Sequence, residues 1–123
     1  MNIFDAIPDD LAEEQVTDIL CDERVRIKRI LSKGHTAPTE GWFDQEDNEW
    51  VMVLEGASMI LFEDGTEHQL DKGDYLYIPA HTKHRVVWTD PDRVTVWLAV
   101  HFDLELSARH RCRSRSRKHS TVL

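Results

Sequence analysis

The sequence predicts an all-β domain, an antiparallel barrel preceded by a short N-terminal helix. Three observations support this prediction. The chain has 123 residues and is 41% hydrophobic, which is enough for one compact domain with its own core. From Arg24 onward, short segments rich in β-branched and aromatic residues follow one another at close intervals. Turn signals containing Gly, Pro and Asp separate them, a spacing typical of an antiparallel barrel or sandwich.

Most of the expected strands lie in the second half of the chain. The alternation that begins at Val25 predicts one earlier strand, and its break at Arg29–Leu31 indicates a bulge or a change of burial. The segment Ser32–Asp47 is expected to be mostly loop, with room for one short strand near Trp42–Gln45. The remaining strands are predicted at Glu49–Leu54, Ser58–Glu63, Glu67–Leu70, Tyr75–Ile78, Arg85–Thr89 and Val94–Phe102.

Three regions are expected along the chain. Residues 1–23 are predicted to contain a helix that packs on the barrel, because Pro8 and two aspartates begin a segment up to Asp22 with roughly helical apolar spacing. The apolar positions of that segment are Leu11, Val16, Ile19 and Leu20. The barrel is expected at residues 24–106, followed by a basic tail at 107–123.

The charge distribution limits the classes of partner. All 23 acidic residues precede Leu106, whereas six of the 15 lysines and arginines follow it. Since an acidic body repels phosphate backbones, a nucleic-acid role could rest only on the tail. The tail is almost without apolar residues and is expected to be a disordered, solvated extension.

Cysteine usage and hydropathy indicate the cellular compartment. Cys21 and Cys112 show no pairing pattern and no zinc-type spacing, which favours a reducing, cytoplasmic setting. No apolar run approaches the roughly 18 residues that a membrane span needs, and the acidic N-terminus does not resemble a signal peptide. Neither secretion nor membrane insertion is expected.

Two motifs resemble those of the cupin family. Glu49 is followed after six residues by Gly56, and Gly73 is followed after five residues by Pro79 and then by His84, with His81 in place of the usual second glycine. The resemblance covers about residues 25–102 and is closest to small single-domain bacterial cupins. It implies the antiparallel double-stranded β-helix of that family, the cupin or jelly-roll barrel.

The resemblance also implies a divalent metal site, but only half of its ligand pattern is present. Metal-binding cupins carry two histidines shortly before the glutamate, and those positions here hold Gln45 and Phe43 in one register or Asp44 and Trp42 in the other. A site of reduced histidine content would consist of Glu49, His84 and either Gln45 or Asp44, with Zn, Fe, Mn or Ni as the ion. The alternative is that Glu49 and His84 are a hydrogen-bonded pair in a polar pocket without metal.

Further residues complete the predicted site. Asp44 is a candidate general base, and His101 shares a strand face with Trp97 and Ala99, from which it could act as a further ligand or as a proton carrier. The aromatic residues expected to line a small-molecule pocket are Trp42, Phe43 and Trp88, the last because it follows His84 by four residues on the same predicted face.

Two functions remain open from the sequence alone. One is a metal-dependent enzyme acting on a small molecule, of the dioxygenase, isomerase or lyase type by analogy with cupins. The other is a non-catalytic module that binds or senses a small molecule without metal. In both cases a homodimer is expected, because the strand containing Trp50, Met52 and Leu54 is apolar on both faces and needs cover on its outer side.

Overall fold

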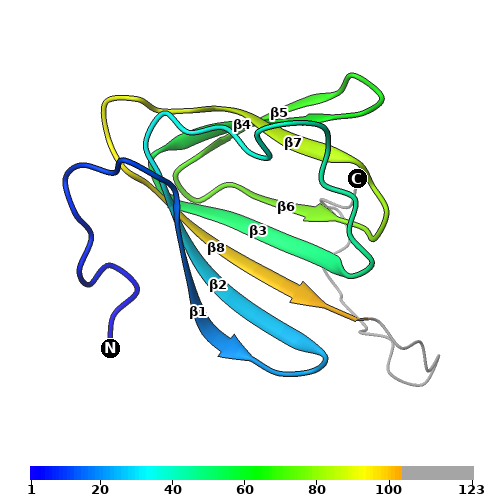
Figure 1. Ribbon diagram of the computed structural model, residues 1–123, viewed down its shortest axis with the longest axis horizontal. Coiled ribbons are helices and arrows are strands. Elements are labelled where there is room, and N and C mark those ends of the chain that lie inside the picture. The colour runs from blue at the N-terminus through cyan, green and yellow to red at the C-terminus, as the bar shows by residue number, and fades with distance from the viewer. Residues whose placement is uncertain (104–123) are drawn as a thin grey trace.

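The computed structural model describes residues 1–103 and shows eight β-strands with no helix in that part of the chain (Figure 1). The strands are β1 (Gln15–Cys21), β2 (Val25–Ser32), β3 (Asn48–Glu55), β4 (Ala57–Phe62), β5 (Glu67–Asp71), β6 (Tyr75–Ile78), β7 (His84–Thr89) and β8 (Thr95–Phe102). Within these residues, no helix is long and apolar enough to cross a lipid bilayer. The prediction for the tail at 107–123 lies outside the described residues.

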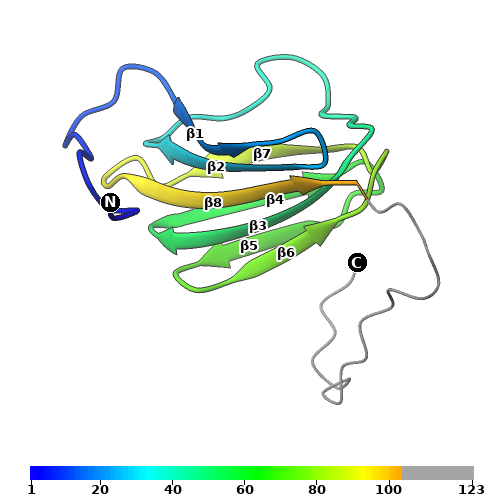
Figure 2. The same ribbon diagram turned by 90° about the horizontal axis from the view of Figure 1, so that it is seen from below.

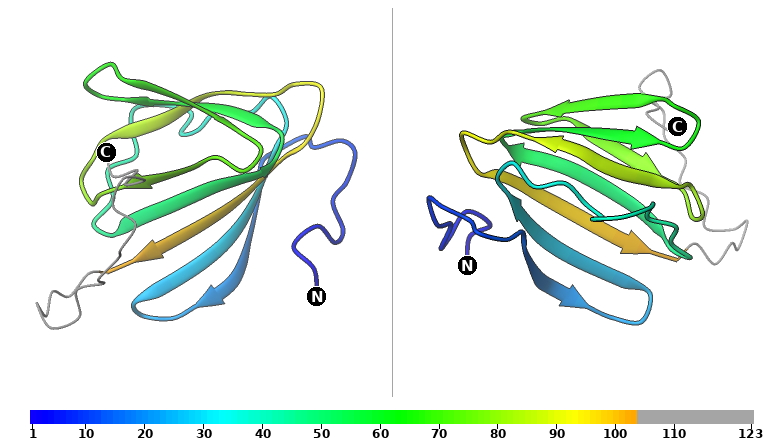
Figure 3. Two further views of the ribbon diagram at one scale, coloured as in Figure 1. Left: turned by 180° about the vertical axis from the view of Figure 1, so that it is seen from behind. Right: turned by 45° about the horizontal axis from the view of Figure 1, so that its top comes forward.

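The strands form two antiparallel sheets that face each other (Figures 2 and 3). One sheet has the order β1-β2-β8-β3-β6, and the other has the order β5-β4-β7. The core lies between them, and its buried residues are Val51, Val53, Ile60, Phe62, Leu70, Leu76, Ile78, Trp97 and Ala99. The prediction of an all-β, jelly-roll-type barrel is therefore confirmed.

The six strands predicted from Glu49 onward are confirmed, each within one residue at either end. The loop before β3 contains two isolated bridges, from Ala37 to Val86 and from Phe43 to His84. The break in alternation at Arg29–Leu31 is a change of burial, because β2 pairs with β8 without interruption while Leu31 and Ser32 are fully buried.

The predicted N-terminal helix between Pro8 and Asp22 is wrong. Residues 15–21 instead form β1, which pairs with β2 at the edge of the larger sheet. The pairing register shifts between Asp18 and Leu20, so Ile19 is an extra residue in a bulge. The bulge explains the error, because it gives a strand the irregular apolar spacing that resembles a helix. The β-branched residues in this segment favour a strand.

The predicted turn glycines have the backbone angles that the motifs require. Gly56 has φ of 92° and Gly73 has φ of 89°, values that side chains with a Cβ rarely adopt. A Cβ on Gly56 would also lie 2.4 Å from Oγ1 of Thr95, so this position excludes other residues for two reasons. His81 also has a left-handed conformation, with φ of 60°, at the position where the cupin motif usually has glycine.

The outer face of the larger sheet carries a row of apolar side chains. The strand registers align Ile27, Val100, Trp50 and Tyr77 across β2, β8, β3 and β6. All four are only partly buried. The N-terminal segment is fixed at the side of this face, where the Arg29 guanidinium donates hydrogen bonds to the Ile3 and Asp5 carbonyls. The homodimer that would cover this row stays a prediction.

Candidate functional site

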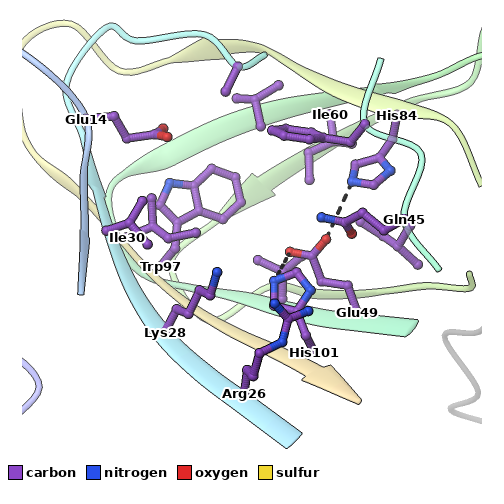
Figure 4. Close-up of a pocket in the computed structure, with 16 residues that line it drawn as sticks. Glu14, Arg26, Lys28, Ile30, Gln45, Glu49, Ile60, His84, Trp97 and His101 are labelled. Carbon is purple, nitrogen blue, oxygen red and sulfur yellow. Dashed lines mark ion pairs between the residues drawn. The ribbon is translucent and has the colours of Figure 1, made fainter. Parts of the chain in front are cut away.

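A pocket of about 210 Å³ opens between the two sheets (Figure 4). Its walls come from every strand except β5 and from the loop between β2 and β3. Apolar side chains of Val51, Ile60, Ile78 and Val86 form much of the lining. The volume is below the roughly 300 Å³ at which drug-sized sites begin, so the pocket suits a small ligand.

Glu49 is the central acidic residue of the pocket. It is only 9% exposed, because alternate residues of β3 point inward and Glu49 begins this inward series with Val51 and Val53. The sheet register places Glu49 opposite His101 on β8 and Ile78 on β6. A carboxylate buried at this depth needs partners, and two imidazoles supply them.

His84 is the first partner of Glu49. Its Nε2 lies 3.5 Å from Oε1 of Glu49, although β7 and β3 belong to different sheets. The Nδ1 of His84 donates a hydrogen bond of 2.8 Å to the Thr82 carbonyl. Since a carbonyl only accepts, this bond fixes the proton on Nδ1 and leaves Nε2 as the atom that faces Glu49.

The environment of His84 favours its charged form. Burial is the largest single effect and lowers the pKa of His84. The hydrogen bond with Glu49, the bond to the Thr82 carbonyl and the negative charge of Glu49 together outweigh burial, so the pKa of His84 lies above its ordinary value of 6.5. The carboxylate of Glu49 therefore faces a histidine whose charged form is favoured over that of a free imidazole.

His101 is the second partner of Glu49. Its Nε2 lies 3.7 Å from Oε2 of Glu49, and its Nδ1 lies 3.5 Å from Oδ1 of Asp47. Asp47 also forms an ion pair with Arg26. Figure 4 shows the Glu49 carboxylate between the two imidazoles, with one ion pair to each. His101 thus lies in the pocket wall, and its role as a ligand or a proton carrier stays a prediction.

Gln45 and Phe43 point into the pocket next to this group. The Phe43 ring centroid lies 5.5 Å from that of His84, and the two backbones are joined by a bridge. Oε1 of Gln45 is buried and has no hydrogen-bond partner among residues 1–103. Figure 4 shows the Gln45 amide beside His84 and Glu49. Of the two registers open from the sequence, the structure has the one in which Phe43 and Gln45 face inward.

Asp44 and Trp42 do not line the pocket, which corrects two predictions. The Asp44 carboxylate lies 3.0 Å from Nδ1 of His81, and its side chain is 43% exposed. The Trp42 ring packs under the Arg85 guanidinium, whose central carbon lies 5.7 Å from the ring centroid. Both lie outside the pocket because alternate residues point to opposite sides of an extended segment.

Trp88 is also outside the pocket, contrary to the sequence prediction. Its side chain is 42% exposed, and it is not among the residues that form the pocket wall. The pairing of β7 with β4 skips Val87, since Met59 is opposite Trp88 whereas Ile60 is opposite Val86. This bulge reverses the alternation, so Trp88 faces away from the side on which His84 lies.

Three charged residues of the pocket were missed by sequence reasoning. Arg26 and Lys28 lie on β2 and Glu14 precedes β1, and all three contribute to the pocket wall. The period of two in β2 was visible in the sequence, but charged residues in such a pattern are normally assigned to the solvent side. Glu14 was hidden in the segment predicted as a helix.

The donor geometry does not match a three-residue metal centre. Residues 1–103 contain no group of three or more His, Cys, Asp or Glu side chains that could hold an ion. In Figure 4 His84 and His101 lie on opposite sides of the Glu49 carboxylate rather than around a common point. An ion at this end of the pocket would therefore depend on the unpaired Gln45 oxygen as a third donor.

Comparisons with known proteins agree with this fold. Residues 30–101 match the family model described as Cupin domain. A crystal structure from Ralstonia eutropha JMP134, provisionally named a mannose-6-phosphate isomerase, is 39% identical, with 84% of this chain and 96% of that chain covered and a TM-score of 0.79. No protein with a curated functional description matches.

More distant structures share the fold alone. A cupin superfamily protein from Desulfitobacterium hafniense DCB-2 is 17% identical, with 79% of this chain and 84% of that chain covered and a TM-score of 0.66. A structure from Silicibacter pomeroyi DSS-3, named as a sugar phosphate isomerase of the cupin superfamily, is 24% identical. The match covers 65% of this chain and 51% of that chain, with a TM-score of 0.54.

Proposed function

This chain belongs to the cupin family, and from that premise we propose that its pocket is the active site of an isomerase-type enzyme for a small hydroxylated substrate. The observation that carries the proposal is the Glu49–His84 pair at 3.5 Å, in which the carboxylate faces a histidine with a raised pKa. A base and an acid in one buried pocket are the two groups that move a proton between neighbouring carbon atoms.

The reaction would follow from the positions of these two side chains. On a substrate with a hydroxyl group next to a carbonyl, Glu49 removes the proton from the hydroxyl-bearing carbon. The electron pair of that C–H bond forms a carbon–carbon double bond, and the carbonyl oxygen takes a proton from Nε2 of His84, which gives an enediol. Glu49 then returns its proton to the neighbouring carbon while His84 takes back a hydroxyl proton, so no proton is gained or lost.

His101 and the pocket walls support this role. His101 holds the second oxygen of Glu49 at 3.7 Å, which keeps Oε1 directed toward His84. The apolar wall formed by Val51, Ile60 and Val86 limits water around the carboxylate, and this strengthens the electrostatic interactions in the pocket. The isomerase name of the 39% identical protein from R. eutropha supports the same reaction class.

A metal-dependent enzyme is the second candidate, and it would use Gln45, Glu49 and His84. The observation in its favour is that His84 donates Nδ1–H to a backbone carbonyl and turns Nε2 toward Glu49, as metal-bound histidines do. Cupins often bind divalent metals, and an ion here would supply Lewis-acid chemistry to substrate oxygens. The unpaired Oε1 of Gln45 would then be the third donor.

One experiment separates these candidates. The purified full chain, prepared without chelators, is assayed by NMR for conversion of erythrose 4-phosphate to the ketose, and its metal content is measured by elemental analysis. We expect ketose formation without a stoichiometric metal, lost in Glu49→Gln. A stoichiometric metal that is lost in both Glu49→Gln and Gln45→Ala would support the metal-dependent enzyme. Ligand binding without turnover would contradict both and leave the non-catalytic module.

A further inference from the structure

The pocket contains buried polar groups that no residue in 1–103 satisfies. Trp97 is only 3% exposed, and its Nε1–H has no hydrogen-bond acceptor. Oε1 of Gln45 is a buried acceptor without a donor. Unpaired polar atoms are rare in protein interiors. An unpaired donor and an unpaired acceptor in one pocket therefore indicate which complementary groups a ligand needs. The ligand needs an acceptor at Trp97 and a donor at Gln45.

Lys28 adds a positive charge on the side of the pocket where Trp97 lies. Figure 4 shows its ammonium group directed into the pocket below the Trp97 indole. The other charged residues of the wall already have polar partners. Arg26 pairs with Asp47, and Glu49 pairs with two histidines. Glu14 accepts a hydrogen bond from Ser32. Within residues 1–103, Lys28 makes no ion pair or hydrogen bond, not even with Asp18 opposite it on β1.

The sheet register gives the spacing between the inward-facing residues along the pocket. Arg26, His101 and Glu49 form one cross-strand row, and Lys28, Ala99 and Val51 form the next inward-facing row. Ile30, Trp97 and Val53 form the third. Neighbouring rows are two residues apart along the strand, which corresponds to roughly 6.6 to 6.8 Å. With carbon–carbon bonds of roughly 1.5 Å, a chain of about four carbons with a charged end group spans one such step, from the row of Glu49 to the row of Lys28.

We propose that the pocket takes a small hydroxylated organic anion, whose phosphate or carboxylate lies on Lys28 and Trp97 Nε1 and whose hydroxyl group donates to Gln45 Oε1. This proposal rests on the proposed function, since it names the substrate class of the same pocket. Lys28 supplies a charge-assisted hydrogen bond, and Trp97 supplies a directed donor. The central part of the ligand lies against Val51, within reach of Glu49 and His84.

Binding of three unreactive four-carbon probes to the full chain tests the proposal. Erythritol 4-phosphate, erythronate and erythritol carry a phosphate, a carboxylate and no charge, and none has a carbonyl group that could isomerise. Isothermal titration calorimetry is expected to show at least about tenfold tighter binding of one or both anions than of erythritol. Their relative affinities show whether the site prefers phosphate or carboxylate.

Two variants assign the anion to its predicted donors. Lys28→Met is expected to remove the preference for the anions while erythritol binding stays unchanged. Trp97→Phe keeps an aromatic ring and is expected to weaken the anions severalfold. The matched control is Lys72→Met, since Lys72 lies in a turn away from the pocket and pairs with Glu55. Thermal unfolding of each variant confirms that it is folded.

Three results would overturn the proposal: equal binding of erythritol and both anions, an unchanged preference in Lys28→Met, or no binding of any probe. Failure of the proposed function has a different outcome. If Glu49→Gln leaves turnover of erythrose 4-phosphate unchanged while Lys28→Met removes the anion preference, the reaction is wrong and the anion site stands. If Glu49→Gln abolishes turnover but the anions bind no more tightly than erythritol, the reaction stands and the anion site is wrong.

Discussion

Nε2 of His84 lies 3.5 Å from Oε1 of Glu49, and the two residues come from opposite sheets. Glu49 begins the inward-facing residues of β3, and His84 is the first residue of β7. The contact therefore forms only when the two sheets close over the pocket. Because this contact raises the pKa of His84, it links the stability of the fold to pH. The same two side chains are the acid and the base of the proposed reaction.

The stability of the protein should fall as pH rises through the raised pKa of His84. A histidine whose folded pKa lies above its unfolded value contributes stability that is complete below about 6.5 and is lost above the folded pKa. The unfolding free energy, measured by urea titrations between pH 5.5 and 9, should therefore decline toward the upper part of this pH range. Glu49→Gln removes the charge that raises this pKa, so its decline should be smaller. If the unfolding free energy of the unchanged chain and of Glu49→Gln depended on pH in the same way, the interaction of His84 with Glu49 would be contradicted.

Gly56→Ala should destabilise the fold strongly. The new Cβ would lie 2.4 Å from Oγ1 of Thr95, and φ of 92° is unfavourable for alanine. Strain of this kind costs about 1 to 3 kcal/mol for the backbone alone, and the clash adds to it. Gly41→Ala is the matched control, since Gly41 has φ of 72° but no atom near its Cβ position. Chemical denaturation should show a clearly larger loss for Gly56→Ala, and equal losses would argue against the close approach.

Phe43→Ala should weaken ligand binding, and Trp88→Ala should not. Phe43 lines the pocket beside His84, whereas Trp88 is turned outward by the bulge at Val87. Calorimetry with erythronate should show weaker binding for Phe43→Ala and no change for Trp88→Ala. A loss of binding in Trp88→Ala, with its unfolding midpoint unchanged, would be inconsistent with this assignment.

The apolar row on the outer face predicts a homodimer. Ile27, Val100, Trp50 and Tyr77 are aligned across four strands and only partly buried. Light scattering should give about twice the chain mass of 14.4 kDa. Trp50→Glu places a charge in the row and should shift the protein toward the monomer, whereas Lys83→Glu, at a half-buried position outside it, should not. A monomeric mass for the unchanged chain would refute the dimer.

The strands were predictable because their signals are local. Alternation and turn residues define β3 to β8 within one residue, and Gly56 and Gly73 occupy positions that need their backbone freedom. The errors at β1 and at Trp88 have a common cause. Each follows a bulge, and one extra residue in a strand reverses the face of every residue beyond it.

The site was only partly predictable from the sequence. Motif spacing brought together Glu49, His84 and Gln45, and the strand face of Trp97 placed His101 correctly. Lys28 could not be assigned, because a charged residue on an alternating strand carries no mark of which face is solvent. Glu14 was missed because it lies in the segment predicted as a helix. Their contribution depends on β1 and β2 extending the larger sheet past the pocket, which is a property of the tertiary structure.

The most direct test of the central claim is deuterium incorporation into erythrose 4-phosphate in D₂O, followed by NMR at the carbon next to the carbonyl. The full chain should introduce deuterium at that carbon, and Glu49→Gln should reduce the rate by roughly 10² or more, the usual contribution of a positioned base. Lys83→Glu should leave the rate unchanged. Absence of deuterium with the unchanged chain, or an equal rate in Glu49→Gln, would contradict the assignment of Glu49 and His84 as the base and acid of this pocket.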